Sequence, residues 1–233
     1  MAYIQGVLAA MRLAVVIPAH NEGQTIGPLV KAVKALGHDC IVINDGSADQ
    51  TRAMALEAGA VVLDTPVKSG KGNALKMGFD YVKTKGYELL VTMDGDGQHA
   101  PSDIPALEVC YKAKGADIVN GNRMANPTGM PWLRLFTNHL MSSLISLICR
   151  QHIPDTQCGF RLLKTKVLEA VHLRSSDFEI ETEVLIKASK KGFKIASVGI
   201  QTIYSNEISK IQPMRDTGRF IAYLWRELRD KNG

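Results

Sequence analysis

Short aliphatic runs alternate with segments of helical spacing through the first half of the chain, and this alternation limits the fold more than any other feature. Runs that are apolar throughout are typical of parallel strands covered on both faces, and the intervening helices supply the cover. The pattern therefore predicts an α/β fold with a mainly parallel sheet flanked by helices. The predicted strands span residues 13–17, 40–43, 60–63, 89–93 and 117–120, and the predicted helices span 25–36, 49–58, 71–85 and 102–114.

The second half of the chain is predicted to contain three further helices and one strand. The helices span residues 132–150, 178–191 and 216–231, and the strand spans 195–203. No repeat or low-complexity linker interrupts the 233 residues, and a hydrophobic content of 45% is enough for a substantial core. We therefore expect one domain over residues 1–233.

Polar or glycine-rich segments follow the first four predicted strands. The carboxyl ends of parallel strands meet at one edge of a sheet, and ligands bind at that edge, so these segments predict one shared site. Taken singly, each could be a turn, a loop or a helix cap. The segments span residues 18–22, 44–49, 68–74 and 94–97.

Asp94 and Asp96 are the strongest candidates for metal ligands. Residues two apart in an extended chain point to the same side, so these carboxylates would converge if the chain stayed extended past Met93. Oxygen donors suit a hard divalent cation such as Mg²⁺ or Mn²⁺, and Gly95 would let a ligand approach the backbone. A turn is the alternative, because Asp-Gly is a common turn signal.

The composition excludes several classes of protein. A formal net charge of +5 suits an anionic partner but is too small to indicate nucleic acid, which we do not expect as a partner. The four cysteines form no C-x-x-C pair and are interpreted as reduced thiols. No apolar run has the length needed to cross a bilayer, and the first eleven residues lack the pattern of a signal peptide. The expected location is therefore the cytoplasm.

Six motifs occur together in a known family, and the match to that family runs from about residue 13 to residue 219, nearly the whole chain. The chain resembles the family 2 glycosyltransferases with the GT-A (Rossmann-like) fold, and in particular the dolichyl-phosphate mannosyltransferases and polyprenyl-phosphate glycosyltransferases. The most specific motifs are the D-x-D with its trailing Gln-His and the D-x-x-x-G-F-R. The six motifs occupy residues 18–22, 44–47, 70–72, 93–99, 121–123 and 155–161.

The resemblance implies an inverting hexosyltransferase that uses a nucleoside diphosphate sugar of the GDP-mannose or UDP-glucose type. A metal, Mg²⁺ or Mn²⁺, would neutralise the departing diphosphate. It also implies a nucleotide-sugar-binding half over about residues 12–125 and an acceptor half over about 126–233. The implied metal ligands are Asp94, Asp96 and Gln98, and the implied catalytic residues are Asp94, Asp96 and Asp155. The implied nucleotide-sugar-binding residues are Pro18, Ala19, His20, Glu22, Ile43, Asp45, Lys71, Asp94, Gly95, Asp96, Arg123, Arg134 and Lys210.

The acceptor implied by the resemblance is a polyprenyl or dolichyl phosphate. A phosphate is already ionised near neutral pH, so it needs no strong general base, whereas a hydroxyl acceptor would need one. Asp155 and Glu183 are the carboxylates that the motifs place on the acceptor side. For each of them the alternative is a structural role, either positioning a loop or pairing with Arg161.

Two helical segments could bring the protein to a membrane surface. Residues 132–150 carry a wide apolar stripe with Arg134 and Arg150 near its ends, and residues 216–231 form a basic amphipathic pattern. These features predict peripheral contact with the inner face of the cell membrane. Packing in the core, in a homodimer or against solvent is the alternative, and the sequence leaves it open.

Two other classes of function stay open at this level. A nucleotidyltransferase also uses carboxylates and a metal on an α/β sheet, but it would normally show a Gly-rich basic loop after the first strand, and residues 18–22 are not such a loop. A non-catalytic nucleotide-sugar-binding or regulatory protein would retain the same acidic and basic residues. Turnover of the sugar donor separates the two classes from a glycosyltransferase.

Overall fold

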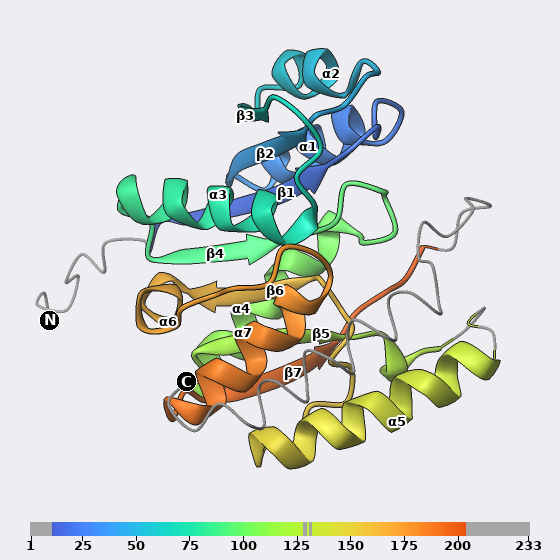
Figure 1. Cartoon of the computed structure of the whole chain (residues 1–233), viewed down its shortest axis with the longest axis vertical. Coiled ribbons are helices and arrows are strands. Elements are labelled where there is room, and N and C mark those ends of the chain that lie inside the picture. The colour runs from blue at the N-terminus through green and yellow to red at the C-terminus, as the bar shows by residue number, and fades with distance from the viewer. Residues whose placement is uncertain (1–10, 128–129, 131, 204–233) are drawn as a thin grey trace, which may run out of the picture.

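A single seven-stranded sheet organises the described part of the protein, which is a computed structural model covering residues 11–127, 130 and 132–203 (Figure 1). The strand order is β3-β2-β1-β4-β6-β5-β7, and every pairing is parallel except those of β6, which runs antiparallel to both β4 and β5. The strands are β1 (Leu13–Ala19), β2 (Asp39–Asp45), β3 (Val61–Thr65), β4 (Leu89–Thr92), β5 (Ile118–Asn122), β6 (Arg161–Lys164) and β7 (Ile195–Gly199).

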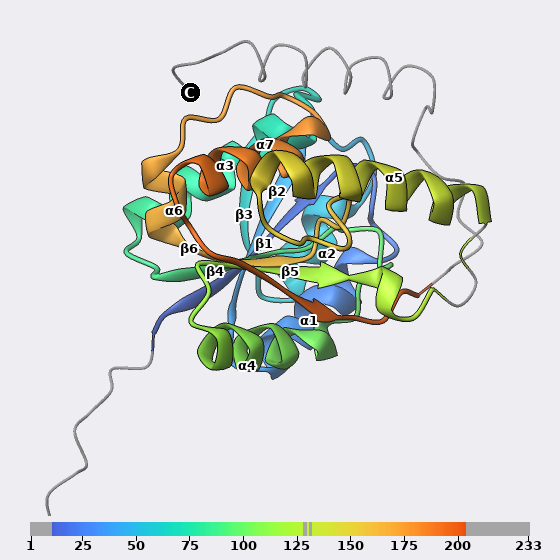
Figure 2. The ribbon, with the colours of Figure 1, turned by 90° about the horizontal axis from the view of Figure 1, so that it is seen from below.

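Helices cover both faces of the sheet, as Figure 2 shows with the sheet seen near its edge. One face carries α1 (Ile26–Ala35), α2 (Thr51–Glu57) and α4 (Ile104–Lys114). The other face carries α3 (Lys71–Thr84), α5 (Trp132–Cys149), α6 (Thr165–Ala170) and α7 (Glu179–Lys190). Two short 3₁₀ helices, η1 (Pro101–Asp103) and η2 (Arg123–Ala125), precede α4 and follow β5.

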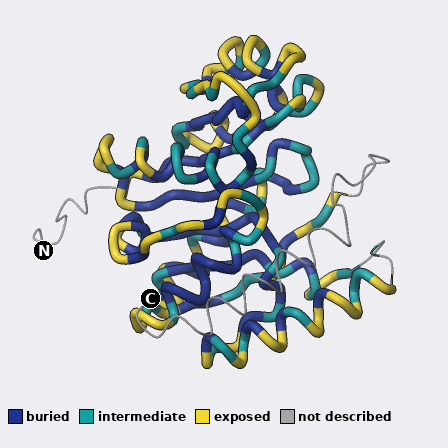
Figure 3. Tube along the Cα trace, viewed as in Figure 1, coloured by how far each residue is buried: buried dark blue, intermediate teal, exposed yellow. Residues whose placement is uncertain are grey.

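The central strand β1 shows why these apolar runs become buried strands. Val15 and Ile17 pack into the core on the face of α1 and α4, while Ala14 and Val16 pack into the core on the face of α3. All four side chains are inaccessible to solvent, and the tube in Figure 3 is dark blue along the middle of the sheet. An apolar residue at every position is therefore what a strand with two covered faces requires.

The predicted α/β fold is confirmed, with one strand that the sequence pattern did not reveal. Strand β6 has only four residues and carries Arg161 and Lys164 at its ends, so it lacks the apolar run that marks the other strands. Its antiparallel insertion makes the sheet mixed. The predicted strand over residues 195–203 ends earlier, at Gly199. Lys210 and the predicted helix over residues 216–231 lie outside the described residues.

Helix α5 turns its apolar stripe away from the protein. Small or polar residues such as Asn138 and Ser142 face the interior together with Ile145, so the alternative that the stripe packs in the core does not hold for most of its side chains. In the described ranges, no helix combines the length and the apolar character needed to cross a membrane. The exposed side chains are Trp132, Leu133, Phe136, Leu140, Leu144 and Leu147.

Candidate functional site

The loop after β4 packs against the loop after β1, as the shared strand edge predicts. The Thr25 hydroxyl donates a hydrogen bond to the Gly95 carbonyl at 2.6 Å, and a Cβ atom at Gly95 would lie 3.3 Å from the Pro18 carbonyl oxygen. The chain does not stay extended past Met93, however, and residues 95–96 form a turn. The prediction that strand alternation aligns Asp94 with Asp96 is therefore wrong, because a turn sets their directions.

Asp94 lies in an ion-pair cluster with Lys71 and Glu181. The Lys71 ammonium at the start of α3 is 2.5 Å from Asp94 Oδ1 and 2.7 Å from Glu181 Oε1, which α7 contributes from the opposite half of the chain. Burial disfavours the charged form of Asp94, but Lys71 and His99 together outweigh burial and lower the pKa of this carboxyl. Burial likewise opposes the charge on Lys71, and the two carboxylates raise the pKa of its ammonium above the ordinary value.

Asp96 is a carboxylate whose charge is poorly compensated. Its Oδ1 accepts a hydrogen bond from the backbone amide of Gln98 at 3.0 Å, which fixes the turn. Burial, and after it the negative charge of Asp94, raises the pKa of Asp96. Two neighbouring carboxylates, of which Asp96 has no ion-pair partner among the described residues, offer the oxygen donors that Mg²⁺ or Mn²⁺ prefers, so these residues fit such a cation.

The carboxylates of Asp94 and Asp96 do not form part of a larger metal cluster. Among the described residues, no three His, Cys, Asp or Glu side chains are grouped so that they could hold a metal ion. A cation at this turn would therefore rely on the two carboxylates and the amide oxygen of Gln98, as the sequence predicted. Such a site leaves coordination positions for the oxygens of a ligand.

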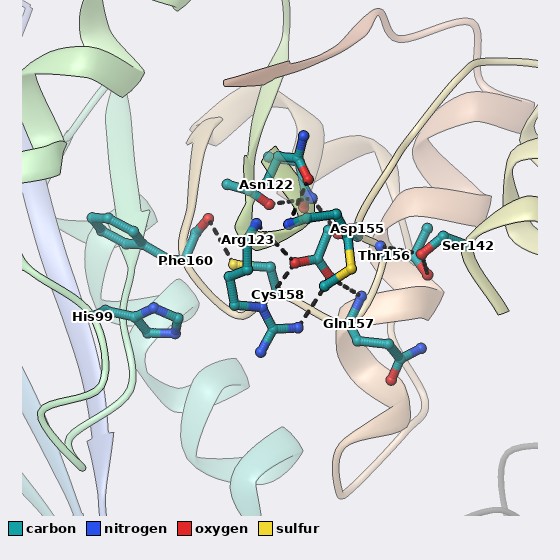
Figure 4. Close-up of polar contacts among 12 residues, drawn as sticks. His99, Asn122, Arg123, Ser142, Asp155, Thr156, Gln157, Cys158 and Phe160 are labelled. Carbon is teal, nitrogen blue, oxygen red and sulfur yellow. Dashed lines mark hydrogen bonds and ion pairs between the residues drawn. The ribbon is translucent and has the colours of Figure 1, made fainter. Parts of the chain in front are cut away.

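His99 supports Asp94 from inside the protein. Its ring is almost fully buried and lies beside Phe160 (Figure 4), stacked with ring centroids 5.3 Å apart. Its Nε2 lies 3.6 Å from Asp94 Oδ2. Gly159, the residue before Phe160, leaves space for the Asp94 carboxylate, because a Cβ atom at Gly159 would come within 3.1 Å of Asp94 Oδ2. His99 is thus part of the packing that fixes the direction of the Asp94 carboxylate.

Asp155 is fully buried and holds Arg123 in a two-pronged ion pair. Nε of Arg123 donates to Oδ2 at 2.8 Å and a terminal nitrogen donates to Oδ1 at 3.0 Å, as Figure 4 shows. Burial opposes ionisation of Asp155, but hydrogen bonds from Arg123 more than compensate and lower its pKa. A buried carboxylate with both oxygens on a guanidinium is poorly placed to accept a proton from an acceptor. The structure thus argues against the predicted catalytic role of Asp155 and favours a positioning role.

Asp45 holds a loop in this structure and does not face an open site. Its two oxygens accept hydrogen bonds from the Ser69 amide and hydroxyl, both at 2.7 Å, and from the Gly70 amide at 2.9 Å. Burial disfavours the ionised carboxyl, but these donors lower its pKa. Asp45 thus supports the loop that leads into Lys71, and its predicted contact with a nucleoside stays a prediction. The side chain of Ile43, also predicted at the nucleotide, lies in the hydrophobic core.

The glycines around Lys71 allow α3 to begin against a distant loop. A Cβ atom at Gly72 would lie 2.6 Å from the backbone carbon of Ser176 and 2.8 Å from the Asp177 nitrogen. The Asn73 amide donates to the Ser176 carbonyl at 3.2 Å across the same contact. The Gly-Lys-Gly motif is therefore required for close packing, which carries Lys71 to the side of α7.

Glu183 has the structural role that was the alternative in the sequence analysis. Its carboxylate accepts hydrogen bonds from the Arg174 and Ser175 amides at 2.9 and 2.8 Å and pairs with Lys187 at 2.8 Å. It does not pair with Arg161, whose guanidinium donates to backbone carbonyls, among them that of Cys158 at 2.7 Å. Loop positioning by Glu183 is thus confirmed.

The remaining predicted residues that the structure describes lie at the same edge of the sheet or on α5. His20 Nδ1 is 2.7 Å from the Asp45 carbonyl oxygen, Glu22 accepts the first amides of α1 at its carbonyl, and Ala19 is buried at the end of β1. Arg134 is half-buried near the start of α5. Sequence reasoning missed Glu181, because acidic residues in the first turn of a helix are already explained by the helix dipole.

Comparisons with known proteins agree with this architecture. The family described as Glycosyl transferase family 2 matches residues 14–171. Polyprenol monophosphomannose synthase of Mycolicibacterium smegmatis is 32% identical over 207 residues, covering 81% of this chain and 76% of that protein. UDP-N-acetylglucosamine–dolichyl-phosphate N-acetylglucosaminyltransferase of Methanococcus voltae is 28% identical over 221 residues, covering 85% of this chain and 88% of that protein.

A solved structure shares the fold at lower identity. Glucosyl-3-phosphoglycerate synthase from Mycobacterium tuberculosis, in complex with Mn²⁺, uridine diphosphate and phosphoglyceric acid, superposes with a TM-score of 0.73 and 22% identity. The match covers 94% of this chain and 78% of that chain. This similarity confirms the predicted GT-A fold class.

Proposed function

This chain belongs to glycosyl transferase family 2, and from that premise we propose that it moves a hexose from a nucleoside diphosphate sugar to a polyprenyl phosphate, with inversion at the sugar. The observation that carries the proposal is the meeting of Lys71, Asp94 and Asp96 at the carboxyl edge of the sheet. Opposite charges concentrated at this edge suit a ligand that carries both phosphates and a bound cation.

The donor lies against the first half of the chain in this proposal, and the acceptor against the second. In the first half, His20, Glu22 and Lys71 bind the donor. In the second half, Arg134 and Lys210 bind the phosphates of the sugar nucleotide. Arg123 keeps a guanidinium beside the site through its pair with Asp155. Guanidinium and ammonium groups suit phosphate oxygens because they donate several charge-assisted hydrogen bonds.

Asp94, Asp96 and Gln98 would hold the divalent cation, Mg²⁺ or Mn²⁺. When bound, the cation supplies a Lewis acid that offsets the negative charge developing on the leaving diphosphate. The fit rests on the chemistry of the donors, two carboxylates and a side-chain amide oxygen carried within five residues at the carboxyl edge of the sheet. The structural relative from Mycobacterium tuberculosis, which binds Mn²⁺ together with uridine diphosphate, supports the same expectation.

A phosphate acceptor agrees with the chemistry of the site. The named relatives act on polyprenol or dolichyl phosphate, and they use different sugars, so both GDP-mannose and UDP-glucose types of donor belong to the proposal. An ionised phosphate attacks without a general base, which suits a site where Asp155, the carboxylate predicted on the acceptor side, is buried on Arg123.

The outward face of α5 supports peripheral contact with the inner face of the cell membrane. A lipid-linked phosphate is presented at a membrane surface, and α5 exposes six large apolar side chains, among them Leu140 and Leu147. An amphipathic helix binds an interface by burying such a face among the lipids. A homodimer that covers the same face is the alternative.

Transfer of labelled sugar to a short polyprenyl phosphate tests the function. We expect metal-dependent release of GDP or UDP by the wild-type protein, and Asp96→Ala to lower turnover about 100-fold or more, since it removes one of the two carboxylates at the cation. Asp80→Ala, which removes an exposed carboxylate on α3, serves as the matched control and retains full turnover. A protein that binds the sugar nucleotide but never consumes it belongs to the binding class instead.

A further inference from the structure

The Lys71 ammonium occupies one oxygen of Asp94, a carboxylate that we expect at the divalent cation. It contacts Asp94 Oδ1 at 2.5 Å and Glu181 Oε1 at 2.7 Å, and it lies 5.6 Å from the centre of the Phe178 ring. The ammonium is thus bound by two carboxylates and faces an aromatic ring. A divalent cation that takes an oxygen of Asp94 must compete with this ammonium, because both satisfy the same negative charge.

The two carboxylates that contact Lys71 differ in their access to solvent. The Glu181 side chain is 12% exposed, whereas that of Asp94 is 27% exposed. An incoming cation therefore reaches Asp94 more easily, and Glu181 is the more sheltered of the two partners. Gly159 adjoins both, because a Cβ atom there would lie 2.5 Å from Glu181 Oε1 and 3.1 Å from Asp94 Oδ2.

A divalent cation and the Lys71 ammonium would serve different carboxylates of this site. Lys71 is in direct contact with Asp94 and Glu181, and the Glu181 charge also acts on the nearby Arg123 and Arg161 guanidinium groups. Asp96 forms no ion pair among the described residues, although its charge adjoins that of Asp94. A divalent cation would therefore bring to Asp94 and Asp96 the positive charge that Lys71 alone does not provide.

We propose that Lys71 occupies Asp94 before the metal binds, and that Glu181 is the positioning residue that retains the Lys71 ammonium when a divalent cation takes over Asp94. Lys71 then stays beside the cation, where it can donate to the phosphates of the donor. The inference rests on the proposed metal-dependent function. It assigns Glu181 a role that acts through Lys71 and requires no contact between Glu181 and the sugar nucleotide.

A double-mutant cycle on Mn²⁺ binding to the full-length chain, without sugar nucleotide, tests this role. Lys71→Met removes the competing ammonium, so we expect Mn²⁺ to bind about tenfold more tightly. In Glu181→Gln, Asp94 is the one carboxylate left to Lys71 in this cluster, so we expect Mn²⁺ to bind about tenfold more weakly. In the Lys71→Met background, Glu181→Gln should change the Mn²⁺ dissociation constant less than twofold, because its partner is absent.

The control is Glu179→Gln, which removes the same charge two residues earlier on α7, and we expect it to leave Mn²⁺ affinity unchanged in both backgrounds. Lys71→Gln provides a second neutral background should Lys71→Met not fold. Equal weakening by Glu181→Gln in both backgrounds would show that Glu181 acts through its charge alone and would overturn the proposal. Unchanged Mn²⁺ affinity in all variants would overturn it as well.

The sugar-transfer assay separates this inference from the proposed function. If the wild-type protein transfers sugar but the variants of the cycle all bind Mn²⁺ equally, the glycosyltransferase proposal is kept and the role of Glu181 is overturned. A protein that shows the expected cycle but transfers no sugar supports the role of Lys71 and Glu181 at the cation and removes the proposed reaction.

Discussion

The ion pair of Arg123 and Asp155 lies in the interior, with both of its charges almost inaccessible to water. Asp155 has no exposed surface, and the Arg123 side chain is 8% exposed. Such a pair contributes little net stability over apolar residues, but removing one partner leaves an uncompensated buried charge. The pair therefore holds the loop after β5 and the segment before β6 together. Removing one residue of the pair is destabilising mainly because the other charge stays buried without a counter-ion.

Asp155→Asn should lower the free energy of unfolding at pH 7 by about 3–5 kcal/mol, because the Arg123 charge is left buried without a counter-ion. The hydrogen bonds from Arg123 that overcome burial lower the pKa of Asp155 in the folded protein. Its contribution is therefore complete above the ordinary aspartate pKa of about 3.9 and is lost as the pH falls through the lower folded value. Urea unfolding between pH 7 and pH 2 measures both effects.

Asp80→Asn is the matched control for this measurement. It breaks the surface pair between Asp80 and Lys83, whose side chains are 70% and 31% exposed. Surface pairs contribute at most about 1 kcal/mol, so this variant should unfold like the wild type at every pH. Equal losses in the two variants would show that Asp155 is not a critical partner of Arg123.

Helix α3 depends on how closely its first turn approaches the loop of residues 175–177. The contact is made by backbone atoms on both sides, so a methyl group at Gly72 has no flexible side chain to displace. The same contact sets the position of Lys71 relative to Glu181. Stability and the geometry of the cation cluster are therefore coupled at the start of this helix.

Gly72→Ala should destabilise the protein by about 1–3 kcal/mol, because the added Cβ would sit 2.6 Å from the Ser176 backbone. Gly27→Ala on α1 is the matched control, since the nearest atom to its Cβ would be Met54 Cε at an ordinary 3.5 Å. Gly27→Ala should stabilise the protein by about 0.5–1 kcal/mol, as alanine is the better helix former. Thermal unfolding of the two variants should thus shift in opposite directions.

Helix α5 is the element that the proposed membrane contact depends on. Replacing Leu140 and Leu147 by Glu places charges on its outward face, where the wild-type side chains are 59% and 76% exposed. Each buried leucine contributes roughly 1.5–3 kcal/mol, so we expect binding to vesicles with anionic lipid to fall at least tenfold without loss of folding. Co-sedimentation with such vesicles measures this, and Val109→Glu on α4, 66% exposed, is the control.

Unchanged vesicle binding by the Leu140 and Leu147 variant would rule out α5 as the membrane face. Sedimentation of the same variant in the absence of lipid addresses the alternative. A dimer that forms through this face would dissociate when two glutamates are introduced, whereas a membrane-binding face would leave the oligomeric state unchanged.

The whole molecule brings four strand ends and two distant helices to one edge of a mixed sheet. Strand β6 enters antiparallel between β4 and β5, and this places Gly159, which precedes it, beside Asp94. The hydroxyl of Thr92 donates to the Gly159 carbonyl at 2.7 Å and ties the two segments together. The acceptor-side half of the chain thereby completes a site that the first half begins.

A ligand that spans this edge should stabilise the whole fold. At one hundred times its dissociation constant, a specific ligand adds about 2.7 kcal/mol, which corresponds to a rise of several degrees in Tm for a chain of this size. We expect GDP-mannose or UDP-glucose to raise the Tm in the presence of Mn²⁺, and the preferred donor to give the larger shift. Thermal-shift measurements that show no effect of either donor, with or without metal, would count against a sugar-nucleotide site.

The sequence determined the parallel strands of the sheet, though not the antiparallel β6, and the edge at which the polar residues gather. Both follow from local signals, since strand and helix periodicities are set by neighbouring residues and parallel strands end on the same side. The resemblance in the motifs then indicated the family. The strand ends and the motifs identified Lys71, Asp94 and Asp96 as site residues, before any contact between them was known.

The tertiary structure alone decided which of these residues face each other. Asp155 is buried on Arg123, Asp45 holds the loop before Lys71, and Glu181 shares Lys71 with Asp94. None of these pairings has a local signature, because each joins segments that are far apart in the chain and is set by packing across the sheet. A carboxylate looks the same in a sequence whether it is open to a ligand or paired inside the protein, and only its surroundings in the fold distinguish the two.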